Sequence, residues 1–387
     1  MTFDIKPAGP AINIAVVSAG TLLCFALGTV HAFSVFLEPL ESSLNAGRAS
    51  VSFTYSLALI SITLAVLIGP VIFARLQPRI LVMLAGLTAV VGCLWAGFAT
   101  SIWHVWAGYG VVFGLANGLG YGFSLQMAAL ASPQREGLAM GIITASYALG
   151  AAVSPAVFSW SLVQFGFAGS MGALAMLLVA ILPAASIGMQ RCDVSFLSVA
   201  NKSDQPPTVI SGEVTIWLAY GAGVLAGLMV IGHAAAIASA RDAHMPFWLA
   251  PVIVAACNLV GSLLGGAVLD RVNPKRALPF FPCLSALGLL VLLNVPGEFG
   301  LIAGLACIGF AYGALIAALP AAISKRFGAL KGTQVYGRVF TAWGSAGLLG
   351  PWLAGLLFDW NANYEMALWL AIACSIVSII AMRRSFN

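Results

Sequence analysis

Residues 50–73 read SVSFTYSLALISITLAVLIGPVIF and contain no charged side chain. A helix needs about 20 consecutive apolar residues to cross the hydrocarbon core of a bilayer. Lipid offers no partner for an open backbone polar group, so a span must be a helix or part of a closed barrel. An unbroken apolar run favours the helix, because barrel strands alternate apolar and polar residues. This stretch therefore predicts a transmembrane helix.

The whole chain has the same character. Of its 387 residues, 61% are hydrophobic and 7% are charged, whereas an ordinary soluble domain carries about 25% charged residues. We therefore expect an all-α membrane protein with twelve transmembrane helices in two pseudo-symmetric six-helix bundles. The predicted spans are 12–37, 50–73, 80–98, 103–127, 138–161, 168–188, 214–237, 247–269, 277–294, 299–323, 336–358 and 364–382.

The distribution of basic residues predicts the orientation. If the N-terminus is cytoplasmic, only Arg48 and Arg241 of the 17 Lys and Arg residues fall outside. Cytoplasmic segments are enriched in Lys and Arg, so we expect both termini in the cytoplasm, in a bacterial inner membrane. Membrane topology then explains the net charge of +5, and no nucleic-acid partner is expected.

The two halves of the chain repeat each other. ARLQPR at 74–79 aligns with DRVNPK at 270–275, and AVSPAV at 152–157 aligns with LLGPWL at 348–353. A polar stretch separates the halves, which predicts an N-terminal bundle at 1–190, a cytoplasmic linker at 191–213 and a C-terminal bundle at 214–387. Such duplication is typical of carriers in which two bundles expose a central site to each side in turn.

The segment GGAVLDRVNPKR at 265–276 resembles the loop between the second and third helices of a half in the major facilitator superfamily. The resemblance implies that Gly266 permits close helix contact and that Asp270 and Arg271 pair across a cytoplasmic gate. The first half keeps the basic residue as Arg75 but has Ala74 where the motif has aspartate.

Three longer segments narrow the resemblance. GTVHAFSVFLEPL (28–40), PQREGLAMGIITASYALGAAVSPAV (133–157) and YGRVFTAWGSAGLLGPWLAG (336–355) are similar to the oxalate:formate antiporter and monocarboxylate transporter group. Members of that group carry an arginine where this chain has Ser262, and the oxalate antiporter has a lysine where it has Trp343. Because both cationic groups are missing, a small dianion such as oxalate is not expected.

His31 and His233 are the only ionisable residues well inside the predicted spans, one on the first helix of each half. All 12 acidic residues fall in loops or at span ends. An imidazole has a pKa near ~6.5, so it can bind an anion when protonated or carry a proton. We predict that the two rings face each other across the path of the substrate. The alternative is that each is a packed polar group satisfied by a neighbouring helix.

Further polar side chains lie at mid-membrane depth. The repeat pairs Tyr147 with Trp343, and these side chains are predicted to stack on or hydrogen-bond a planar substrate. Asn117, Asn258 and Tyr312 are further candidates for substrate binding. Helix packing is the alternative for all five. Tyr55 is expected at the membrane interface, and Arg338 is expected to extend to water from its span end.

The sequence therefore predicts a secondary active transporter of a small organic anion, with a monocarboxylate as first candidate and protons coupled by symport or antiport through the histidines. The alternatives are a carrier of a neutral or zwitterionic solute or a metal chelate, and a sensor or assembly factor that does not transport. No enzyme constellation, nucleotide motif, cofactor or metal site is predicted, and the seven cysteines include no CxxC pair. We expect the monomer to be functional.

Overall fold

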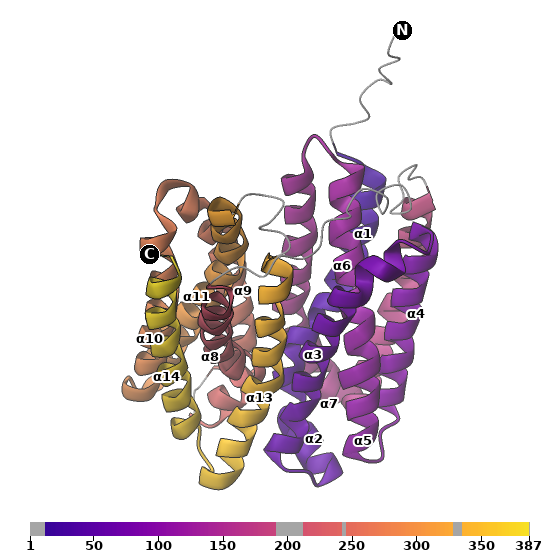
Figure 1. Ribbon diagram of the computed structural model, residues 1–387. Helices are drawn as coiled ribbons and strands as arrows, with labels where there is room; N and C mark the ends of the chain where they lie inside the picture. Colours follow the sequence, from indigo (N-terminus) through magenta and orange to yellow (C-terminus); the bar gives the residue numbers. More distant parts are fainter. Residues whose placement is uncertain (1–11, 191–211, 242–244, 328–334, 387) are drawn as a thin grey trace.

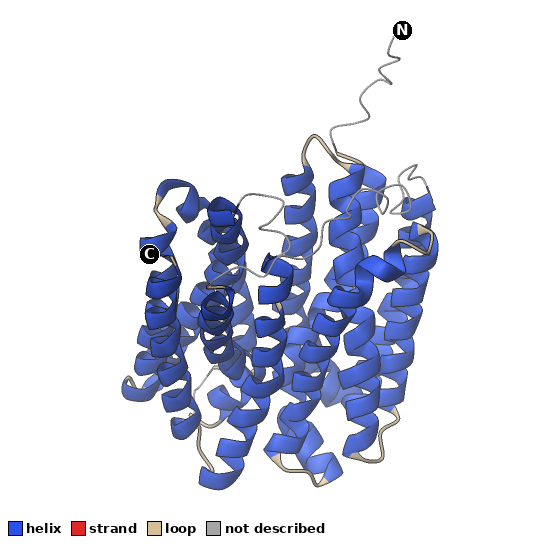
Figure 2. Cartoon of the chain, viewed as in Figure 1, coloured by secondary structure: helices blue, strands red, loops and turns tan. Residues whose placement is uncertain are grey.

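The computed structural model describes residues 12–190, 212–241, 245–327 and 335–386, without the side chains of residues 136, 266, 267 and 270. These residues form helices joined by short turns, and no strand is present among them (Figure 2). The prediction of an all-helical fold is confirmed.

The first half contains the following elements. They are α1 (Ile14–Gly28), the 3₁₀ segment η1 (Thr29–Phe36), α2 (Leu37–Leu44), α3 (Arg48–Phe73), α4 (Pro78–Gly97), α5 (Ile102–Val105), the π-helical η2 (Trp106–Phe113), α6 (Gly114–Ala131) and α7 (Glu136–Gln190). The chain turns within α7 at Gly166, where φ is 67° and ψ is −170°. Glycine adopts such a conformation readily because it has no Cβ. The two predicted spans at 138–161 and 168–188 are therefore the two arms of α7.

The second half consists of α8 (Glu213–Ser239), α9 (Leu249–Arg271), α10 (Pro274–Asn294), α11 (Gly297–Phe327), α13 (Thr341–Asn361) and α14 (Glu365–Ser385). Local sequence explains where several helices begin. The Asn13 side chain accepts a hydrogen bond from the Val16 amide at the start of α1, and Asn273 does the same for Lys275 in α10. Pro274 follows Asn273 at the first helical position, where its missing N–H has no intrahelical partner to lose.

Eight helical segments of the described chain are long and apolar enough to cross a membrane. They include the continuous segment Ile14–Leu44 and the folded α7, Gly137–Gln190. The predicted spans 103–127, 247–269 and 336–358 fall outside this criterion, but they overlap η2 with α6, α9, and α13. Each predicted span thus coincides with a helix.

Helices α1 to α7 lie on one side of the molecule and α8 to α14 on the other, with α3 and α13 adjacent where the two sides meet (Figure 1). The helix α7 also packs against α9 across this boundary. Glycines allow α3 and α13 to approach closely, since a Cβ at Gly355 would lie 2.2 Å from the Ser52 Oγ and one at Gly344 would lie 2.6 Å from the Thr63 Cγ2. Small residues have this role at many membrane helix contacts.

The predicted domain bounds stay a prediction. Most of the proposed linker, at 191–211, lies outside the described residues.

Candidate functional site

His31 lies in η1, at the point where the first membrane helix changes from α to 3₁₀ geometry. Its Nδ1 is 2.6 Å from the hydroxyl oxygen of Tyr55, and its ring lies edge-on to that of Tyr147 with centroids 5.6 Å apart. The ring is partly accessible, and Nε2 has no protein partner within the described residues. A 3₁₀ stretch within a longer helix often marks a functional position. His31 therefore has one nitrogen available to a ligand.

Tyr147 is held beside His31 by its own hydrogen bond. Its hydroxyl donates to Asn117 Oδ1 at 3.0 Å, and Asn117 Nδ2 donates to the carbonyl oxygen of Leu27 at 2.6 Å. A Cβ at Gly28 would lie 2.0 Å from the Tyr147 carbonyl oxygen, so this glycine lets the first helix lie directly against α7. Asn117 is fully buried and connects helices, whereas the Tyr147 ring is partly accessible.

The second half contributes a matching aromatic group. The indole N–H of Trp343 donates to the Tyr312 hydroxyl at 2.9 Å, and the Phe340 ring stacks on the indole with centroids 5.5 Å apart. Trp343 lies on α13, which packs against α3, the helix that carries Tyr55. The aromatic groups of the two halves therefore lie on helices that are in contact. Tyr312 and Trp343 are buried in this conformation.

His233 has a different environment from His31. It is completely buried, with Nε2 2.8 Å from the Pro351 carbonyl oxygen and Nδ1 3.0 Å from the Tyr364 hydroxyl. A carbonyl oxygen only accepts, so Nε2 carries a proton, and in the neutral ring Nδ1 accepts from Tyr364. Both nitrogens are thus used by the protein, and no contact between the rings of His31 and His233 is found in the described structure.

Tyr364 belongs to a polar group that joins the two halves, which we call the inter-bundle network: Glu41, Arg48, His233, Asp359 and Tyr364. Arg48 Nη1 donates to the Tyr364 hydroxyl at 2.7 Å, and Arg48 Nη2 donates to Glu41 Oε2 at 2.8 Å. The carboxylate of Asp359 accepts from the backbone amides of Arg48 and Ala49, both at 2.9 Å. A carboxylate is stabilised at the N-terminus of a helix, here α3.

The sequence did not single out this network as a site. One signal was available, because Arg48 is one of only two basic residues predicted outside, and a lone arginine there needs a specific partner. Its acidic partners fall in loops or at span ends, as all 12 acidic residues of the chain do, so their position alone does not distinguish them.

Two side-chain predictions concern Tyr55 and Arg338. Tyr55 is 1% exposed, and its ring stacks parallel to that of Phe33. Its hydroxyl contacts His31, and its expected place at the membrane interface stays a prediction. Arg338 does not simply extend to water, because its Nη2 donates to Glu213 Oε2 at 2.8 Å at the start of α8.

The remaining predicted residues are not brought together with the central group. Asn258 Oδ1 accepts from the Ser262 hydroxyl at 3.3 Å, where α9 packs against α11. Arg75 and Arg271 are exposed. Gly266 and Asp270 lie in α9, but the surroundings of Gly266 and the side chain of Asp270 are outside the described part of the structure. The gate pairing of Asp270 with Arg271 stays a prediction.

Comparison with known proteins gives consistent matches along the chain. The family model of the Major Facilitator Superfamily matches residues 17–292 and 218–386. The uncharacterized MFS-type transporter YhjX of Escherichia coli is 24% identical, covering 84% of this chain and 83% of that protein. Monocarboxylate transporter 13 of Rattus norvegicus is 25% identical, and the match covers 90% of this chain and 83% of that protein. The oxalate:formate antiporter of Oxalobacter formigenes is 23% identical, and the match covers 90% of this chain and 86% of that protein.

Solved structures agree on the fold. The crystal structure of a D-xylose-proton symporter superposes with a TM-score of 0.76 at 15% identity, covering 96% of this chain and 98% of that one. At this identity the similarity concerns the fold alone.

Proposed function

The chain belongs to the major facilitator superfamily of membrane transporters, and we propose that it carries a small organic anion, a monocarboxylate, by alternating access. The observation that carries this proposal is the open Nε2 of His31 beside Tyr55 and Tyr147. The names of the relatives support the same substrate class, since they include monocarboxylate transporters and an oxalate:formate antiporter.

The chemistry at His31 couples a proton to an anion. In the neutral ring, one nitrogen accepts and the other donates. In the protonated ring both donate, so Nδ1–H can bond to the Tyr55 oxygen while Nε2–H bonds to a substrate carboxylate. An ionised carboxylate in a low-dielectric site is costly unless it is paired and hydrogen-bonded. Protonated His31 and the anion therefore stabilise each other, which favours their movement together.

The surrounding side chains narrow the substrate class. Tyr147 and Phe340 offer partly accessible aromatic rings that suit an apolar or planar substituent, and the buried Trp343 stacks against Phe340. Ser262 and Trp343 stand where relatives place cationic groups, so this site offers a single switchable charge. One charge fits a monoanion better than a dianion. His233, Asn117 and Tyr312 would not touch the substrate. They would fix the positions of the helices that carry the site, through the hydrogen bonds described above.

Uptake into proteoliposomes tests the proposal. Purified protein is reconstituted, and uptake of a library of labelled carboxylic acids is measured with and without an inward proton gradient. We expect the gradient to accelerate uptake of at least one monocarboxylate, and short monocarboxylates to compete more strongly than oxalate. If neither the proton gradient nor carboxylate competitors change the rate of uptake, the result would favour a neutral or zwitterionic solute or a metal chelate as the substrate.

A second candidate function rests on the first-half gate loop. Ala74 replaces the aspartate of the superfamily motif there, which favours a sensor or assembly factor that kept the fold without transporting. Substrate-dependent counterflow in the same vesicles would exclude this alternative.

The placement in the cell is also part of the proposal. The excess of basic residues at one end of the helices favours cytoplasmic termini, in a bacterial inner membrane. The monomer as the working unit is a separate part of the proposal.

A further inference from the structure

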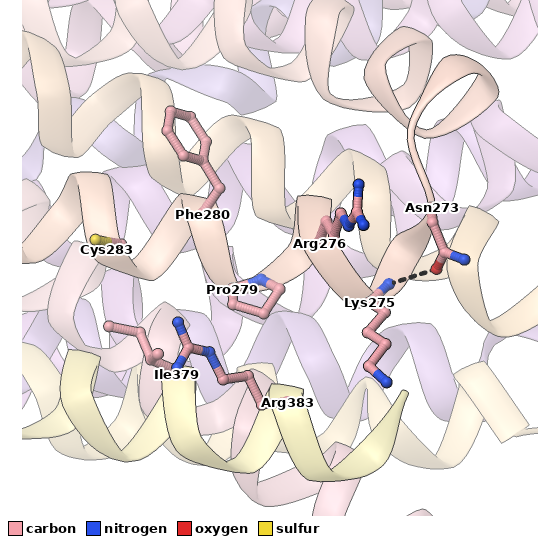
Figure 3. Close-up of a pocket in the computed structure, with 8 residues that line it drawn as sticks. All are labelled: Asn273, Lys275, Arg276, Pro279, Phe280, Cys283, Ile379 and Arg383. Carbon is pink, nitrogen blue, oxygen red and sulfur yellow. Dashed lines mark hydrogen bonds between the residues drawn. The ribbon is translucent and has the colours of Figure 1, made fainter. Parts of the chain in front are cut away.

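A cavity of about 880 Å³ lies between the start of α10 and the end of α14 (Figure 3). Asn273, Lys275 and Arg276 line it from the first turn of α10, and Arg383 lines it from the last turn of α14. No residue that lines the cavity belongs to the aromatic group around His31.

Three cationic residues from two helices line this cavity, with their charged ends pointing in different directions (Figure 3). Lys275, Arg276 and Arg383 are exposed, and no carboxylate pairs with any of them in the described part of the chain. Basic residues at one end of membrane helices are expected from topology alone. Topology does not require that they line one hollow without a described carboxylate partner. The cavity is therefore a site of unbalanced positive charge.

Apart from the three cations and Asn273, the lining is apolar, and exposed apolar residues continue along the same two helices. Phe280 is 57% exposed, and Leu287, about two helical turns further along α10, is exposed as well. On α14, Ile376 and Ile380 are exposed and precede Arg383 by seven and three residues, which places all three on one helix face. A ligand in this cavity meets cations at the end of the helices and an apolar surface along them.

We propose that this cavity binds one acidic phospholipid, with its phosphate between Lys275, Arg276 and Arg383 and an acyl chain along Phe280. Basic pockets between membrane helices suit acidic lipid headgroups, and guanidinium groups bond phosphate oxygens strongly. A free inorganic anion would use the cations but not the apolar surface. The proposal is independent of the substrate proposed above.

Native mass spectrometry of the full-length protein in detergent tests this site. Phosphatidylglycerol and phosphatidylcholine with identical acyl chains are titrated separately. We expect phosphatidylglycerol to bind at least about tenfold more tightly, and the Lys275→Gln/Arg383→Gln variant to lose at least about tenfold of that affinity. Arg384→Gln is the matched control, because Arg384 is exposed on the same turn but does not line the cavity. It should change the affinity less than about twofold.

Several outcomes would overturn the proposal. They are equal binding of the two lipids, an equal loss in Arg383→Gln and Arg384→Gln, and displacement of the lipid by millimolar inorganic phosphate or by an acidic peptide. Arg383→Lys keeps the charge and should retain most of the binding. If the double variant does not fold, the comparison of Arg383→Lys, Arg383→Gln and Arg384→Gln decides the result.

Discussion

At the scale of single residues, the two intramembrane histidines show how one residue type acquires two roles. His31 bonds through one nitrogen and leaves the other open, whereas both nitrogens of His233 bond to Tyr364 and Pro351. The sequence pattern placed them at corresponding positions of the repeat. It could not separate their roles, because their partners come from distant segments of the chain.

His31→Gln tests the role of the open nitrogen. Glutamine can hydrogen-bond but cannot take up a proton, so we expect monocarboxylate uptake to fall at least roughly tenfold, as for loss of a charged hydrogen bond of about 1.5–3 kcal/mol. The remaining uptake should lose its dependence on pH between about 5 and 8. His104→Gln is the control, since His104 lies in the short helix α5 and bonds to Ser101. An unchanged rate and pH profile in His31→Gln would make His31 a packing residue.

Tyr364→Phe tests the inter-bundle network. The substitution removes the hydroxyl between Arg48 and His233, leaving a buried nitrogen and a guanidinium donor unpaired. We expect destabilisation of about 1–3 kcal/mol, measured as a lower midpoint of thermal unfolding in detergent.

Tyr109→Phe is the matched control for this measurement. The Tyr109 hydroxyl is buried without a hydrogen-bond partner, so its removal should leave stability unchanged or raise it. Equal effects of the two substitutions would contradict the hydrogen-bonding account of Tyr364.

At the scale of elements, the sequence predicted most of the helices and little of their irregular geometry. Apolar runs located the spans because lipid demands helices of sufficient length, and the turn between 161 and 168 contains Gly166 as the structure requires. The 3₁₀ geometry of η1 and the π-helical geometry of η2 were not predicted. The apolar pattern locates a helix but does not distinguish its type, and the close contact of Gly28 with α7 just before η1 joins segments that are distant in sequence.

Gly355→Ala tests the close contact of α13 with α3. A Cβ at this position would lie 2.2 Å from the Ser52 Oγ and 2.9 Å from the Arg48 carbonyl oxygen. Backbone atoms cannot turn aside as a side chain can, so the two helices must separate. We expect a longer mean distance between spin labels placed at Ser43 and Asn361, measured by pulsed electron paramagnetic resonance.

Gly172→Ala serves as the control for this change, because a Cβ at Gly172 would meet nothing within 4 Å. Unchanged distances in Gly355→Ala would mean that the α3 to α13 contact tolerates extra volume.

At the scale of the whole molecule, the inter-bundle network joins the two bundles at one end of the protein. Its bonds join α2 and α3 of the first half to α8, α13 and α14 of the second, near the end of the molecule where α2 lies (Figure 1). Such contacts exist only while the bundles are together at that end. In the proposed transport cycle, the stability of these contacts would set how often that end opens.

Asp359→Asn should shift this equilibrium. The substitution removes the negative charge at the N-terminus of α3, which is worth up to about 1 kcal/mol at such a position and corresponds to a change in population of about fivefold. Ser56→Cys is a suitable reporter, because Ser56 is buried at the α3 to α13 contact and accepts from the Trp352 amide. In that background, Asp359→Asn should raise the rate of reaction with a membrane-impermeant maleimide about fivefold.

Glu365→Gln is the control for this measurement, because Glu365 is an exposed carboxylate near the same end, and the substitution should leave the rate unchanged. An unchanged rate in Asp359→Asn would mean that this carboxylate orders α3 locally without holding the two bundles together.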